Sequence, residues 1–379
     1  MDAPDVVVLV PGFLGFSRFG GFYYFADRLV AVLRVLLEEE TQQSVPVVPC
    51  TVLPTSSLAT RQGHLLRYLY RLCTEQVGAV ERLHVVGHST GGVDAQLLAC
   101  TTRVDGTPWS DEEQEVLAHL RTVVTISAPH HGTGLANARL ARFAESPLRD
   151  PFAPLTAGRL FFDLGMLAVR DLAALAGLQA ARIDDVAQFL GHIAFSRALV
   201  HDLRPASMAA VRARVTPRAD VRVTCFASGT VLADGGARPS EPFFRDLYRM
   251  TADGETEAAP EPLRARLRAA AQDPSRVIAS AAVPSADACA DMNDGVVNTA
   301  RQLLDGADLG ALVIADHADV LGHYDRQDDL VEGHSYNAGL FHSGAGFGDA
   351  QFYTLYRRVA RVIASRMPGA SAVTEAVSA

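Results

Sequence analysis

One stretch of the sequence decides the fold: Leu83-His84-Val85-Val86-Gly87-His88-Ser89-Thr90-Gly91-Gly92, in which an apolar run passes through G-x-S-x-G. A serine at such a turn stands clear of a sheet edge only if the residues two before and two after it are small. Gly87 and Gly91 meet that requirement, and the segment 93–100 is rich in helix formers. The order strand, turn, helix therefore predicts that Ser89 is a nucleophile, against the alternative of a glycine-rich turn with an idle serine.

Strand-like and helical patterns alternate along the rest of the chain. The strand-like runs are 6–10, 46–52, 83–86, 122–127, 221–227 and 311–315. Apolar residues recur at helical spacing in 25–40 and 58–77, and Ser110 with Glu113 predicts a capping box that opens a further helix. This alternation predicts an α/β protein with a mostly parallel central sheet flanked by helices.

Two long insertions interrupt the alternation. The segment 135–218 carries helical patterns with many large apolar residues and is predicted to be a helical cap or lid. The segment 229–291 is predicted to be rich in loops, with one helix at 261–271. Because strand patterns resume after each insertion, we expect a single core formed by 1–134 and 219–379.

Composition excludes several classes of protein. With 379 residues, of which 49% are hydrophobic and 20% charged, the chain can bury a large core. The net charge is -9 and no basic stripe is present, which argues against nucleic acid as a partner. The chain contains no stretch of about 20 uncharged apolar residues, so no transmembrane segment is predicted.

The cysteines and the beginning of the chain suggest a reducing compartment. The five cysteines are scattered and mostly lie in apolar patterns, so we expect reduced core residues. No signal peptide precedes the first strand pattern. Cytoplasmic localisation is therefore the default expectation, with secretion by another route left open.

A serine hydroxyl needs a base, and His317 is the best placed histidine. A serine nucleophile on this pattern is followed along the chain by an acid and then by a histidine just beyond the last core strand. His317 lies two residues after the apolar run 311–315. Two aspartates compete for the acid, Asp294 and Asp234, since each lies in a turn-forming segment before a glycine. Position alone does not separate them.

The developing negative charge on a substrate oxygen needs two main-chain donors. The amide after the nucleophile is that of Thr90. The second is expected from the loop after the first core strand, where Phe13 lies in Pro11-Gly12-Phe13-Leu14-Gly15.

At these motifs the chain resembles bacterial lipases and related esterases of the α/β-hydrolase fold. The likeness includes the loop at Phe13, the turn at Ser89, and Ser127-Ala128-Pro129-His130-His131-Gly132-Thr133, which is similar to the A-P-x-x-G-T turn of that family. Asn293-Asp294-Gly295-Val296-Val297 resembles its acid segment, so the resemblance implies Asp294 as the acid. The family commonly has histidine where this chain has Pro11.

The resemblance also implies an activity and an ion. The implied activity is hydrolysis of small-molecule or lipid esters, medium to long in acyl chain, by Ser89, Asp294 and His317 without an organic cofactor. Asp319, in His317-Ala318-Asp319, matches an aspartate that often helps to bind a structural calcium ion in the family. Acyl transfer or thioester hydrolysis by the same acyl-enzyme, and an inactive ligand-binding protein, are the alternatives.

The apolar residues of the segment 135–218 allow two interpretations. A rigid packed cap is one of them. In the other, part of the segment lines an acyl pocket above Ser89, and the candidate lining residues are Phe161, Phe162, Leu167, Phe189 and Phe195.

Overall fold

The computed structural model describes residues 5–13, 18–19, 22–76, 80–137, 198–232, 242–255, 257–280, 283–324 and 343–368. Within these ranges, none of the helices is long and apolar enough to cross a membrane. All five cysteines are free, and four of them are buried.

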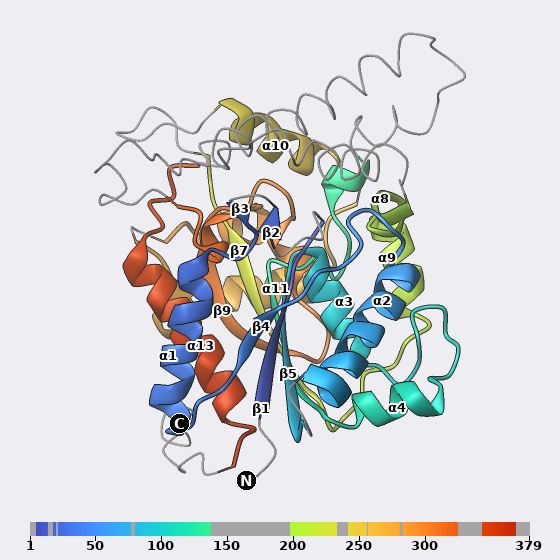
Figure 1. Cartoon of the computed structure of the whole chain (residues 1–379). Helices are drawn as coiled ribbons and strands as arrows, with labels where there is room; N and C mark the ends of the chain where they lie inside the picture. Colours follow the sequence, from blue (N-terminus) through green and yellow to red (C-terminus); the bar gives the residue numbers. More distant parts are fainter. Residues whose placement is uncertain are drawn as a thin grey trace, which may run out of the picture.

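A seven-stranded parallel sheet forms the centre of the molecule (Figure 1), with the strand order β4-β1-β5-β6-β7-β9-β8. Its strands are β1 (Asp5–Val10), β4 (Val47–Pro49), β5 (Arg82–His88), β6 (Leu120–Ile126), β7 (Arg222–Gly229), β8 (Val277–Ile278) and β9 (Asp308–Ile314). A separate short hairpin consists of β2 (Arg18–Phe19) and β3 (Phe22–Tyr23). Every neighbouring pair in the large sheet is parallel.

Side chains of β1 show why the sheet is buried on both faces. Val7 and Leu9 belong to one apolar cluster, whereas Val6, Val8 and Val10 belong to another. Successive side chains of a strand point to opposite faces, so a continuous β-branched run suits a strand that is covered on both sides.

Helices cover both faces. The described ones are α1 (Asp27–Thr41), α2 (Leu58–Arg71), α3 (Thr90–Leu98), α4 (Asp111–Leu117), α8 (Ala198–Asp202), α9 (Pro205–Arg212), α10 (Pro242–Asp253), α11 (Glu261–Ala271), α12 (Ala286–Asp291) and α13 (Asp349–Ala364). Helices α1 and α13 pack side by side on the face of Val7, and α2, α3 and α4 cover the face of Val6 (Figure 1).

The predicted sheet flanked by helices is confirmed, and the structure adds elements that the sequence patterns did not single out. The capping box of Ser110 and Glu113 is present at the start of α4. The segment 229–291 contains α10 and α12 besides the predicted helix α11. Strand β8 has only two residues, which is too short for a period of two to be visible in the sequence.

Several predicted residues lie outside the described ranges. Of the segment 135–218, the structure describes 135–137 and 198–218. The five candidate pocket residues and the alternative acid all lie outside the described residues: Phe161, Phe162, Leu167, Phe189, Phe195 and Asp234.

Candidate active site

Ser89 occupies a tight turn between β5 and α3. Its backbone has φ 56° and ψ -131°, a conformation that non-glycine residues rarely adopt and that is found mainly at functional sites. A methyl group on Gly87 would lie 2.2 Å from the carbonyl oxygen of Gly91, and one on Gly91 would lie 2.3 Å from that of Val10. The turn therefore needs both glycines, for the steric reason that the sequence motif suggests.

The carboxyl ends of parallel strands gather the candidate residues at one edge of the sheet. Phe13 follows β1, Ser89 follows β5, and His317 follows β9. Because β1 and β5 are neighbours in the sheet, the loop at Gly12 lies against the turn of Ser89. A methyl group on Gly12 would be 2.7 Å from Ser89 Cβ. Open α/β sheets typically bind ligands outside this edge.

His317 is hydrogen-bonded to Asp294 twice. The distance from His317 Nδ1 to Asp294 Oδ2 is 2.8 Å, and the main-chain amide of His317 donates to the carbonyl oxygen of Asp294 at 3.0 Å. Since a carboxylate only accepts, Nδ1 carries a proton and Nε2 of a neutral imidazole is left as the basic atom. The pair thus has the arrangement of a base with an orienting acid.

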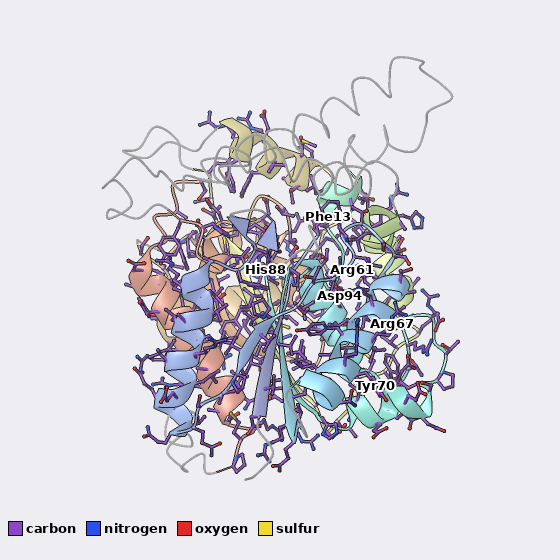
Figure 2. The ribbon with its side chains drawn as sticks, viewed as in Figure 1. Phe13, Arg61, Arg67, Tyr70, His88 and Asp94 are labelled. Carbon is purple, nitrogen blue, oxygen red and sulfur yellow. The ribbon has the colours of Figure 1, made fainter. Side chains whose placement is uncertain are left out.

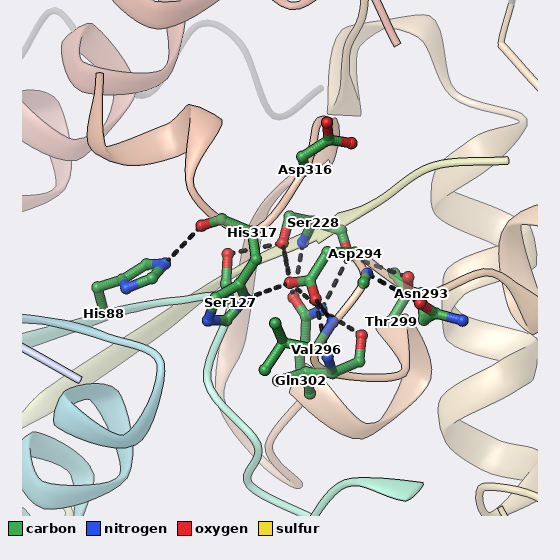
Figure 3. Close-up of polar contacts among 12 residues, drawn as sticks. His88, Ser127, Ser228, Asn293, Asp294, Val296, Thr299, Gln302, Asp316 and His317 are labelled. Carbon is green, nitrogen blue, oxygen red and sulfur yellow. Dashed lines mark hydrogen bonds and ion pairs between the residues drawn. The ribbon is translucent and has the colours of Figure 1, made fainter. Parts of the chain in front are cut away.

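Four further donors hold the carboxylate of Asp294, which is completely buried (Figure 3). Oδ1 accepts from the amides of Val296 at 3.0 Å and Val297 at 2.8 Å. Oδ2 accepts from the hydroxyl of Ser228 at 2.7 Å and from Nε2 of Gln302 at 3.1 Å. These four donors occupy both carboxyl oxygens and fix the side chain beside His317.

The two candidate oxyanion donors come from segments that adjoin Ser89. Thr90 begins α3, and its amide is at the amino end of that helix. Phe13 follows Gly12 in the loop after β1, and we call Pro11, Gly12 and Phe13 the oxyanion loop. Arg61 anchors this loop from below, because its Nη2 donates to the carbonyl oxygens of Pro11 at 3.3 Å and Gly12 at 3.4 Å (Figure 2).

Arg61 itself is held by a buried partner that the sequence analysis missed. Its Nε lies 2.9 Å and its Nη2 2.5 Å from Oδ2 of Asp94, and both side chains are fully buried. The only sequence signal is one charge on the apolar side of each of two helices, α2 and α3. Neither charge can be interpreted until the two helices are known to pack together.

Ser89 and His317 reach the same edge of the sheet, each in the loop after its strand. Among the described residues, no hydrogen bond joins Ser89 Oγ to His317. His88 is the residue before Ser89. The centroids of the His88 and His317 rings are 4.6 Å apart. Catalytic hydrogen bonds are often long without substrate and tighten when it binds.

Asp319 caps its own turn in this structure. Its Oδ2 accepts from the amide of Asp316 at 3.0 Å, and the side chain of Asp316 points away from the pair of His317 and Asp294 (Figure 3). Calcium takes six to eight oxygen ligands. Within the part of the chain that the structure describes, no group of three or more His, Cys, Asp or Glu side chains could hold a metal ion. Calcium at Asp319 therefore stays a prediction of the family resemblance.

A parallel sheet with a serine turn and a histidine and acid pair at its carboxyl edge defines the α/β-hydrolase fold. Solved structures share it: a Staphylococcus hyicus lipase has a TM-score of 0.51 and 13% identity, over 96% of this chain and 97% of that one. EstA from Clostridium botulinum has a TM-score of 0.50 and 18% identity, over 97% of this chain and 88% of that one.

The sequence comparisons cover less of the molecule. A triacylglycerol lipase of Pseudomonas fragi is 27% identical over 147 residues, which is 39% of this chain and 42% of the relative. The chain thus matches less than half the length of that relative. No protein-family model matches the sequence.

Proposed function

We propose that this protein is a carboxylic ester hydrolase that works through an acyl-enzyme on Ser89. The observation that carries the proposal is the hydrogen bond between His317 and Asp294, on loops at the sheet edge where Ser89 occupies its strained turn. This combination supplies a nucleophile, a base and an acid that orients the base.

Each residue has one task in the reaction. As Ser89 Oγ attacks the ester carbonyl, Nε2 of His317 takes its proton, and Asp294 stabilises the resulting imidazolium. His317 then gives the proton to the oxygen of the departing alcohol, which leaves an acyl group on Ser89. In the second half, His317 removes a proton from a water molecule, which attacks the acyl-enzyme and releases the carboxylic acid.

The amides of Thr90 and Phe13 stabilise the oxyanion of both tetrahedral intermediates in this proposal. Donors that are already oriented cost little reorganisation when charge develops, and one such donor is typically worth about 10²–10³ in kcat. The anchoring of the loop by Arg61 supports this role, since it fixes the main chain next to Phe13.

We propose lipid esters with medium to long acyl chains as substrates. Support comes from the matching segment of the Pseudomonas fragi triacylglycerol lipase and from the apolar residues of the segment 135–218. Phe161, Phe162, Leu167, Phe189 and Phe195 are the proposed lining of an acyl pocket.

The proposed chemistry needs no cofactor. Calcium at Asp319 stays a prediction of the family resemblance, and no step of the reaction is assigned to it. Thermal unfolding with EDTA and with added calcium chloride tests it, because an ion that binds only the folded chain raises Tm.

Labelling with a fluorophosphonate probe tests the proposed function. We expect the probe to modify Ser89, identified by mass spectrometry of its peptide, and Ser89→Ala to abolish both labelling and hydrolysis of p-nitrophenyl esters. Ser275→Ala, which changes an exposed serine in another turn, is the matched control and keeps both. Labelling of another residue, or ester turnover by Ser89→Ala above about one per cent, overturns the assignment.

A further inference from the structure

Two hydrogen bonds and one close packing contact link the oxyanion loop to the histidine loop through the residue before Ser89. The hydroxyl of Tyr24 lies 2.7 Å from Nδ1 of His88. Nε2 of the same ring lies 2.9 Å from the carbonyl oxygen of His317, a contact that Figure 3 shows. Tyr24 and His88 are both buried, with 6% and 1% of their surfaces exposed. Water therefore does not compete for these bonds.

The chemistry of the partners fixes where each proton lies. A carbonyl oxygen only accepts, so Nε2 of His88 carries a proton and donates it to His317. Nδ1 of a neutral ring is then an acceptor, and the hydroxyl of Tyr24 must donate to it. Burial, and next the neighbouring His317, lower the pKa of His88 well below its usual value, which keeps the ring neutral.

The oxyanion loop lies at the other end of these contacts. The hydroxyl of Tyr24 lies directly against Gly12, the residue before Phe13. A methyl group on Gly12 would lie 2.4 Å from this oxygen, so the loop packs directly on Tyr24. Both hydrogen bonds thus run in one direction, from Tyr24 through His88 to the carbonyl of His317, and Gly12 packs against the first donor.

We propose that Tyr24 and His88 are positioning residues that hold the oxyanion loop and His317 in register with Ser89. The proposal rests on the proposed ester hydrolysis. The amide of His317 is fixed by Asp294 and its carbonyl by His88, so both ends of the residue are tied down. Misplacement of a reacting group by about 1 Å can cost about a hundredfold in rate, which makes such anchoring consequential.

Kinetics with p-nitrophenyl esters test the tyrosine. We expect Tyr24→Phe to lower kcat about tenfold or more and to leave KM within about twofold, because alignment and not binding is lost. The matched control is Tyr324→Phe. It removes a buried hydroxyl that donates to Asp349 and is bonded to neither His88 nor His317. It should leave kcat within about twofold at a comparable loss of Tm.

Graded replacements test the histidine. His88→Leu removes both bonds and should lower kcat most. The side-chain amide of His88→Gln can reach the position of Nε2 and donate to His317, and that of His88→Asn can reach the position of Nδ1, so each should restore part of the loss. His84→Gln is the control, because His84 is equally buried on β5 but bonds Asp5 at the other end of the strand. Equal kcat values for His88→Leu, His88→Gln and the wild type contradict the inference.

A spectroscopic measurement does not depend on activity. In ¹⁵N-histidine-labelled wild-type protein at pH 7, the signals of His88, assigned by their loss in His88→Gln, should show the neutral ring with the proton on Nε2. A proton on Nδ1 of His88, or a charged His88 ring, overturns the proposed role of Tyr24 and His88. Failure of the proposed function looks different, since wild-type protein then neither labels at Ser89 nor hydrolyses esters.

Discussion

Arg61 and Asp94 form a completely buried ion pair beneath the oxyanion loop, and each belongs to a different helix. Arg61 also donates from Nη1 to the carbonyl oxygens of Leu53 at 2.5 Å and Pro54 at 3.1 Å. One guanidinium thus joins α2, α3, the loop at 53–54 and the oxyanion loop.

Breaking this pair should destabilise the protein. Asp94→Asn keeps the volume but leaves the charge of Arg61 buried without its partner, so we expect a loss of about 3–5 kcal/mol in the free energy of unfolding. Urea unfolding followed by circular dichroism measures it. The double variant Arg61→Met with Asp94→Leu removes both charges and should lose less than Asp94→Asn alone. A change below about 1 kcal/mol in Asp94→Asn contradicts a strong pair.

Asp294→Asn should lower kcat by about ten-thousandfold, because an amide in place of the carboxylate favours the wrong tautomer of His317. Steady-state kinetics and circular dichroism together show that the folded protein has lost its activity. Asp291→Asn is the matched control, since this exposed aspartate of α12 contacts Arg264 and not the site. If Asp234→Asn lowers kcat more than Asp294→Asn does, the orienting acid is Asp234.

A series of p-nitrophenyl esters tests the acyl pocket. Each buried methylene adds up to about 0.8 kcal/mol of binding, so kcat/KM should rise severalfold from acetyl to octanoyl esters. Phe162→Ala should lower the value for octanoate more than that for acetate. If acetate is the best substrate and activity falls steadily with length, the apolar residues of the segment 135–218 serve packing alone.

Acid should weaken the fold through two histidines that follow β6. Burial lowers the pKa of both His130 and His131 to about 3. Below pH 6.5 the unfolded chain takes up protons that the folded protein excludes, so this stabilisation is complete above about pH 6.5 and falls as the pH drops toward 3. Each histidine contributes a slope of up to about 1.4 kcal/mol per pH unit.

Urea unfolding between pH 7 and pH 5 measures that slope, in a range where few carboxyl groups titrate. His130→Gln should flatten it. His201→Gln, at a largely exposed histidine of α8, should leave it unchanged. An identical slope in wild type and His130→Gln means that His130 contributes nothing to acid sensitivity.

The sequence predicted what depends on local order. The turn at Ser89 is specified by neighbouring residues, namely two glycines and a β-branched run, so its place between a strand and a helix could be predicted. Strand β1 could be predicted equally well from its continuous apolar run, and the structure buries every side chain of that run. The residues near Asp294 were identified by resemblance and not by position.

What the sequence did not predict depends on contacts between distant segments. Tyr24 and His88 are 64 residues apart, and His88 and His317 are 229 apart. A tyrosine and a histidine in apolar surroundings look like ordinary core residues until the sheet brings the strand ends together. The same holds for Ser228 and Gln302, whose bonds to Asp294 need β7 beside β9.

The strand order has a consequence for the nascent chain. Among the described strands, β9 comes last along the chain, yet it lies between β7 and β8. Until it emerges from the ribosome, β7 has an unpaired edge and β8 has no neighbour to pair with. An exposed edge of this kind invites association with other chains. Because His317 follows β9, a ribosome-bound chain that ends before this strand is both prone to aggregate and without its proposed base, so the proposed activity can begin only when β9 has joined the sheet.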